Sequence, residues 1–191
     1  MINTDELCIV NYCHPNCVPF FNICRLPKEE AFATAYKMAK ENPDTTAFYR
    51  FADFENYYPR RMKTDAYLYD LFNSLGGSPK ERHPLSFVLQ GSEYLDNWFG
   101  KGTINKIRLK DIPSAYISFT LGDSMVVTKK DGLMVNEIQH GKLIMYTKEM
   151  LYDVLNRYNG TFGDFLNEIN EKYKYIEAQL WDDGYCNLSP W

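Results

Sequence analysis

The stretch Tyr175–Trp181, Tyr-Ile-Glu-Ala-Gln-Leu-Trp, is the part of the sequence that most restricts the fold. Its residues alternate strictly, with Ile176, Ala178 and Leu180 on one side of an extended segment and polar or aromatic residues on the other. The glutamate and the glutamine therefore emerge side by side between two aromatic rings. Such a face is either part of a small-molecule site or the solvated side of an ordinary sheet, and the alternation by itself favours the second interpretation.

Other segments carry the signals of strands and helices. Alternation predicts strands over Thr45–Ala52, Pro84–Gln90, Ile104–Leu109, Ala115–Leu121 and Lys142–Tyr146, a short strand over Asn22–Leu26, and a hairpin that runs from Ser124–Thr128 through Asp131-Gly132 to Leu133–Ile138. Caps and spaced apolar residues predict helices over 28–41, from Thr64 to Gly76, from Ser92 to Gly100, from Thr147 to Arg157, and over 162–172.

These elements indicate an α+β fold. Strands outnumber helices, and hairpins are mixed with helical connections. We expect a single globular domain over residues 1–191, with a mixed or mainly antiparallel sheet and about five helices packed on it. Residues 1–26 are expected to form an irregular or extended lead-in, because Pro15 and Pro19 interrupt it.

Composition and charge exclude some classes of function. The net charge of −4 argues against a nucleic-acid partner, which requires a basic surface. No apolar run reaches the length of a membrane span, and the first residues lack the order of a signal peptide, so we expect a cytoplasmic protein. Aromatic residues make up 16% of the chain, which suits the lining of a polar cavity or an interface as well as an ordinary core. The oligomeric state is left open.

Four of the five cysteines gather near the N-terminus together with a histidine. The cluster consists of Cys8, Cys13, His14, Cys17 and Cys24. Thiolates and an imidazole suit zinc, but the spacing lacks the C-x-x-C knuckle of common zinc modules. We therefore favour packed free thiols and no metal, with a structural zinc as the alternative.

The chain carries none of the common phosphate-loop, dinucleotide, zinc-protease or nucleophile-elbow motifs. Instead, polar side chains lie on one face of three predicted strands. They are Arg50 on the first, Ser118 and Thr120 on the second, and Glu177 and Gln179 on the third. The turn that follows the second strand adds Asp123 near the same strand end.

If the three strands are neighbours, these groups line one cleft. The planar guanidinium of Arg50 suits a phosphate or a carboxylate. The hydroxyls of Ser118 and Thr120 suit a ribose or an amide. Glu177 suits the stabilisation of positive charge on a sugar carbon, or the activation of a nucleophile.

The order of these residues resembles that of a known enzyme family. Arg50, then Ile-Ser-Phe-Thr at 117–120, then Tyr-Ile-Glu-Ala-Gln at 175–179 resembles the arginine, Ser-Thr-Ser and Glu-x-Glu series of the arginine-type ADP-ribosyltransferases. The resemblance implies that NAD is bound as a substrate in a cleft of a split mixed sheet. It implies ADP-ribosyl transfer or NAD glycohydrolysis as the activity.

The resemblance also implies a role for individual residues. Arg50 would hold the dinucleotide, Ser118 would support the site, and Glu177 would stabilise the oxocarbenium-like ribose as nicotinamide leaves. The sequence departs from the family in two places, because Phe119 replaces a small polar residue and Gln179 stands where the final acid is expected.

A second interpretation is a non-catalytic module that binds a protein or a small ligand. We predict that the segment 53–61 is an exposed loop. Its sequence, Asp-Phe-Glu-Asn-Tyr-Tyr-Pro-Arg-Arg, combines acidic, aromatic and arginine residues. Tyr57, Tyr58 and Arg61 are of the residue types that carry interface energy. A salt-bridged surface loop explains the same residues equally well.

Overall fold

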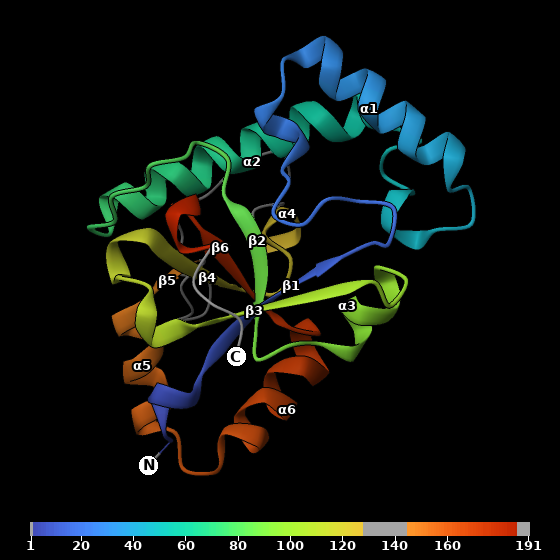
Figure 1. Cartoon of the computed structure of the whole chain (residues 1–191). Coiled ribbons are helices and arrows are strands. Elements are labelled where there is room, and N and C mark those ends of the chain that lie inside the picture. Colours follow the sequence, from blue (N-terminus) through green and yellow to red (C-terminus); the bar gives the residue numbers. More distant parts are fainter. Residues whose placement is uncertain (1, 128–144, 187–191) are drawn as a thin grey trace.

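A six-stranded sheet with the order β3-β1-β2-β6-β4-β5 forms the centre of the computed structural model, which describes residues 2–127 and 145–186 (Figure 1). Every pairing between neighbouring strands of this sheet is antiparallel. The strands are β1 Cys8–Cys13, β2 Leu85–Leu89, β3 Thr103–Arg108, β4 Ile117–Leu121, β5 Met145–Thr147 and β6 Ile176–Leu180.

Six α-helices occur in the described ranges, so the α+β prediction is confirmed. They are α1 Lys28–Glu41, α2 Phe54–Ser74, α3 Glu93–Trp98, α4 Ser124–Val127, α5 Lys148–Arg157 and α6 Phe162–Tyr173. Side-chain caps begin three of them, and they include the reciprocal capping box that Thr161 forms with Asp164. The helices predicted at 28–41, 147–157 and 162–172 form where the caps and the spacing placed them.

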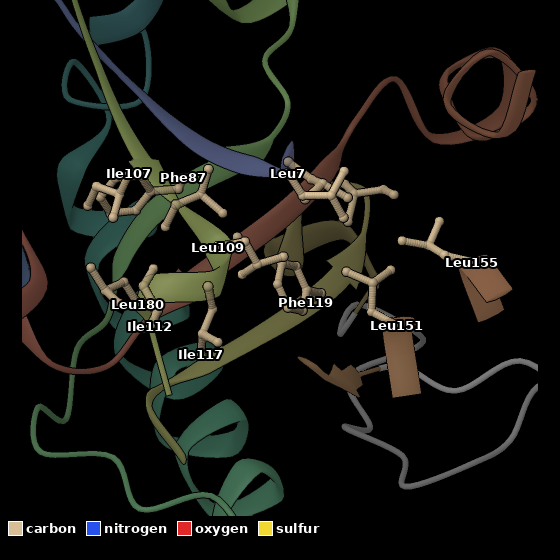
Figure 2. Packing of buried hydrophobic residues seen from close by; sticks show 14 of the residues in the cluster. Leu7, Phe87, Ile107, Leu109, Ile112, Ile117, Phe119, Leu151, Leu155 and Leu180 are labelled. Atoms are coloured by element: carbon tan, nitrogen blue, oxygen red, sulfur yellow. The ribbon is translucent and has the colours of Figure 1, made fainter. Parts of the chain in front are cut away.

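Helices cover both faces of the sheet. Figure 1 shows α1 and α2 on one side and α5 and α6 on the other. The α5–α6 side holds the largest apolar core, where Leu151 and Leu155 pack against strand residues such as Phe119 (Figure 2). The opposite side holds smaller apolar clusters, and in one of them Phe72 of α2 stacks on Trp181.

Strand β6 lies between β2 and β4 and is buried along its whole length. Its apolar side chains face the large core, as the alternation predicts. Its polar side chains are also buried, so the interpretation of this face as the solvated side of an ordinary sheet is wrong. Helix α2 covers that face because Trp181, the next residue of the chain, packs against Leu68 and Phe72.

The lead-in 1–26 is extended over β1, which pairs on both sides, and is not irregular there. Two strand predictions for the residues after β1 are wrong. Asn22–Leu26 holds a 3₁₀ turn, Ile23–Arg25, which the Asn22 side chain caps. Thr45–Ala52 is not a strand either, because a 3₁₀ turn at Thr46–Phe48 and successive local hydrogen bonds satisfy its backbone.

The predicted loop 53–61 is helical, and it forms the first half of α2. Thr64, expected as an N-cap, lies inside the same helix. The helical pattern is hidden in the sequence because inward positions of α2 carry the polar residues Arg61, Thr64 and Asp65. Pro59 lies in the second turn of the helix.

The predicted hairpin is only partly covered by the described residues. Its first strand is replaced by the short helix α4 at Ser124–Val127. The turn Asp131-Gly132 and the return strand Leu133–Ile138 lie outside the described ranges. Of the strand predicted at Lys142–Tyr146, the described part belongs to β5. In the part of the chain that the structure describes, no helix combines the length and the apolarity needed to cross a bilayer.

Lys148 at the start of α5 provides a test of the packing. Its ammonium group is buried and donates to the carbonyl oxygens of Leu109 at 2.8 Å and Ile112 at 2.7 Å. The substitution Lys148→Met leaves both carbonyls without this donor, so we expect a loss of about 2–3 kcal/mol in the free energy of unfolding, measured by urea denaturation. The exposed control Lys110→Met should change it by less than about 0.5 kcal/mol. Equal losses of stability in the two variants would show that the hydrogen bonds of the Lys148 ammonium group do not stabilise the fold.

Candidate functional site

A cavity of about 320 Å³ lies on the α2-covered face of the sheet. Its walls come from β1, β2, β6, α2 and α3, and from the segments around residues 20–24, 47–51 and 123. The ladder between β1 and β2 is short and consists of the pairs Ile9↔Leu89 and Val10↔Val88. Beyond Val10 the next residues of both strands line the cavity, so the cavity lies where these strands stop pairing.

Glu177 projects from β6 into this cavity and is 5% exposed. The Ser86 hydroxyl donates to its Oε1 at 3.0 Å, and the backbone N–H of Ser124 donates to its Oε2 at 2.6 Å. Burial and the negative charge of Asp123 raise the pKa of Glu177 above its usual range, whereas Arg61 and the Ser124 N–H oppose that rise. The carboxyl group is therefore held firmly in a place that disfavours its charged form.

Arg50 reaches the cavity from a turn and not from a strand. Its Nη2 lies 3.0 Å from Oδ2 of Asp123, and its Nε donates to the Tyr49 hydroxyl at 2.8 Å. The guanidinium also lies 5.8 Å from the centre of the Tyr57 ring. Arg50 and Asp123 thus meet at the cavity, and Arg50 reaches it from the turn that follows Thr46–Phe48.

Arg61 lies on the same wall, deep in α2. Its Nε is 2.8 Å from Oδ1 of Asp65, and the other oxygen of Asp65 is 2.8 Å from Nδ1 of His83. Tyr57 lines the cavity one turn earlier, whereas Tyr58 packs against Phe32 and Phe54 and does not line it. These residues belong to helix α2, so the prediction of an exposed recognition loop at 53–61 is wrong.

Ser118, Thr120 and Gln179 are fully buried beside Glu177 and do not line the cavity. Ser118 Oγ donates to Oε1 of Gln179 at 2.9 Å, and Nε2 of Gln179 donates to Oγ1 of Thr120 at 3.0 Å. Nε1 of Trp181 donates to Ser118 Oγ at 2.9 Å. The register explains this row, because β4 and β6 pair Ser118 with Gln179 and Thr120 with Glu177. The three residues complete one another's hydrogen bonds inside the protein.

Aromatic side chains form much of the cavity wall and its rim. Tyr94 stacks on Tyr175 with ring centres 6.4 Å apart, and Trp98 meets Tyr49 edge-on at 5.5 Å. Phe21 and Tyr94 line the cavity and are 52% and 41% exposed, so the rim of the cavity is aromatic and open to solvent. An arrangement of aromatic walls with a few convergent polar groups is typical of small-molecule pockets.

Sequence reasoning missed several lining residues. Ser86 contacts Glu177 directly, and its position could have been inferred, because Leu85 and Phe87 on the other face leave Ser86 facing the cavity. Asn11 and Tyr12 were missed because β1 was not recognised as a strand. The rim residues of α3 carry no signal beyond their aromatic character.

The described side chains of the cysteine cluster are not arranged as a metal site. The ring of His14 accepts a hydrogen bond from the Asn16 N–H at Nδ1, and its Nε2 lies 3.3 Å from the Thr45 hydroxyl. All five cysteines are free thiols. Among the residues that the structure describes, no group of three or more His, Cys, Asp or Glu side chains is placed to hold a metal ion.

Comparison with known protein families, with curated proteins and with solved structures gave no match.

The buried row predicts that Ser118 supports the fold and does not contact a ligand. Ser118→Ala removes the partner of both Gln179 Oε1 and Trp181 Nε1, so we expect a loss of about 1–3 kcal/mol in the free energy of unfolding. The exposed control Ser78→Ala should stay within about 0.5 kcal/mol. Chemical denaturation measures both. A Ser118→Ala variant as stable as the wild-type protein would show that Ser118 does not support the fold.

Glu177 should reduce stability at neutral pH. Because its pKa is raised in the folded protein, the protonated carboxyl favours folding below the unfolded-state pKa, about 4.3, and this advantage is lost as the pH rises through the folded pKa. We expect Glu177→Gln to be more stable by about 1 kcal/mol at pH 7, with a smaller difference at pH 4. Thermal unfolding at both pH values measures this. The exposed control Glu171→Gln should show no such trend; a variant less stable at pH 7 would contradict the prediction.

Proposed function

We propose that the protein is an enzyme that acts on NAD or a related nucleotide, by ADP-ribosyl transfer or by NAD glycohydrolysis. The observation that carries the proposal is the convergence of Arg50, Asp123 and Glu177, from three distant segments, on one aromatic-lined cavity. Glu177 would stabilise positive charge on the ribose carbon as nicotinamide leaves, because a fixed carboxylate in a site shielded from water acts strongly on developing charge.

The size of the cavity supports a nucleotide ligand that is only partly enclosed. Ligand pockets commonly measure about 300–1,000 Å³, and this cavity of about 320 Å³ is at the lower end. It would hold one ring with its sugar, while the phosphates would lie near Arg50, whose side chain is 32% exposed. The aromatic side chains of Phe21 and Trp98, which also line the cavity, suit contact with a second planar group.

The motif resemblance gives further support. Glu177 and Gln179 project from the same face of β6, but Gln179 is buried, is hydrogen-bonded to Ser118 and Thr120, and does not line the cavity. Glu177 is therefore the acid of the Glu-x-Gln motif that meets the cavity. The separation of β1 and β2 beside it parallels the split sheet that the family resemblance implies, although all pairings here are antiparallel.

A non-catalytic small-ligand receptor is the second candidate. Both oxygens of Glu177 already accept hydrogen bonds, and its raised pKa favours the neutral form, which stabilises charge poorly. For either function we propose a cytoplasmic location and a small-molecule partner. The five free thiols support a reducing compartment.

Thermal unfolding and nicotinamide release test the two candidates together. NAD or ADP-ribose at about 100 times its dissociation constant should stabilise the native state by about 2.7 kcal/mol, seen as a higher Tm. Glu177→Gln should lower the rate of nicotinamide release about 100-fold or more, because it removes the charge that faces the ribose. The control Glu171→Gln should keep the wild-type rate.

The outcomes separate cleanly. Binding without nicotinamide release by the wild-type protein favours the receptor. No shift in Tm with NAD, ADP-ribose or ATP removes the nucleotide proposal.

A further inference from the structure

The charges in the cavity wall are not evenly paired. Arg50 forms an ion pair with Asp123, and Arg61 forms one with Asp65. Within the described residues, Glu177 has no cation within ion-pair distance, and its partners are the hydroxyls of Ser86 and Ser124 and the backbone N–H of Ser124. When Glu177 is ionised, the wall therefore carries one negative charge that the surrounding side chains do not pair.

Aromatic rings line the same cavity as this carboxylate. Tyr175 directly precedes β6 and lies two residues before Glu177, and both side chains line the cavity. The rings nearby already hold cations, because the Arg50 guanidinium lies over Tyr57 at 5.8 Å and the Lys174 ammonium lies over Tyr94 at 4.7 Å. The electron-rich face of an aromatic ring attracts positive charge.

We propose that the cavity selects a planar, positively charged aromatic ring, of the N-alkylated pyridinium kind, over a neutral ring of the same shape. Tyr175 stacks on the ring, and the carboxylate of Glu177 supplies the opposite charge. This inference rests on the proposed function for its ligand class, since the nicotinamide ring of NAD is cationic and that of its reduced form is neutral.

The physical reason is the desolvation of Glu177. A neutral ring that fills the cavity takes the remaining water from the carboxylate and gives no charge in return, so Glu177 must either stay ionised at a high cost or take up a proton. A cationic ring compensates that charge directly. The other ionisable groups that act on Glu177 are Asp123 in the β4–α4 turn and Arg61 on α2, and each is already in an ion pair of its own.

Matched ligand pairs test the inference by isothermal titration calorimetry at pH 7.5. The pairs are 1-methylnicotinamide with nicotinamide, and NAD with its reduced form. We expect the cationic member of each pair to bind the wild-type protein about tenfold more tightly. In Glu177→Gln the ratio should fall to about threefold or less, because only the aromatic attraction is left, and Glu171→Gln should keep the wild-type ratio.

Equal affinities in the wild-type protein, a preference that survives unchanged in Glu177→Gln, or no binding of either pair would each overturn the inference. Its failure differs from failure of the proposed function. Equal binding of oxidised and reduced NAD, together with nicotinamide release, refutes the charge selection and keeps the enzyme. A preference for 1-methylnicotinamide over its neutral partner, without any nicotinamide release, keeps the selection and removes the enzyme.

Discussion

The central position of β6 is the constraint on which the rest of the structure depends. The strand pairs with β2 on one side and β4 on the other, so its register decides which side chains of three strands share a face. Because the side-chain period of a strand is two, a shift by one residue would move Glu177 and Gln179 into the apolar core. The apolar set of β6, packed against α5 and α6, therefore also positions the polar set on the opposite face.

The polar face of the sheet divides into two parts with different physical roles. The side chains of Ser118, Thr120 and Gln179 form hydrogen bonds with one another and with other buried groups. This network stabilises the interior. Glu177 is instead buried beside Asp123 at the wall of a cavity, where its charged form is disfavoured. A buried carboxylate of this kind lowers the free energy of unfolding. Such destabilising groups are found most often at functional sites.

The cavity itself results from elements that are distant in the chain. The end of the short β1–β2 ladder leaves room between two strands, helix α2 contributes Tyr57 and Arg61 to the wall, and α3 supplies aromatic residues to the rim. The two arginines of the wall come from different backbone settings, Arg50 from a turn and Arg61 from a helix, and each is balanced by its own carboxylate. Because both arginines are paired, the carboxyl group of Glu177 determines the charge that the cavity wall offers to a ligand.

The sequence by itself determined the fold class, the amphipathic helix α1, the capped helices α5 and α6, and the strands β2, β3, β4 and β6, because alternation, helical spacing, caps and turn residues act locally. It also placed Ser118, Thr120, Glu177 and Gln179 on common strand faces. Only the tertiary structure decided that α2 begins at Phe54, since its buried polar residues are paired by partners far along the chain, such as His83. It also decided which polar residues line a cavity and which hydrogen-bond to one another in the interior, because burial and strand order depend on contacts that no local pattern encodes.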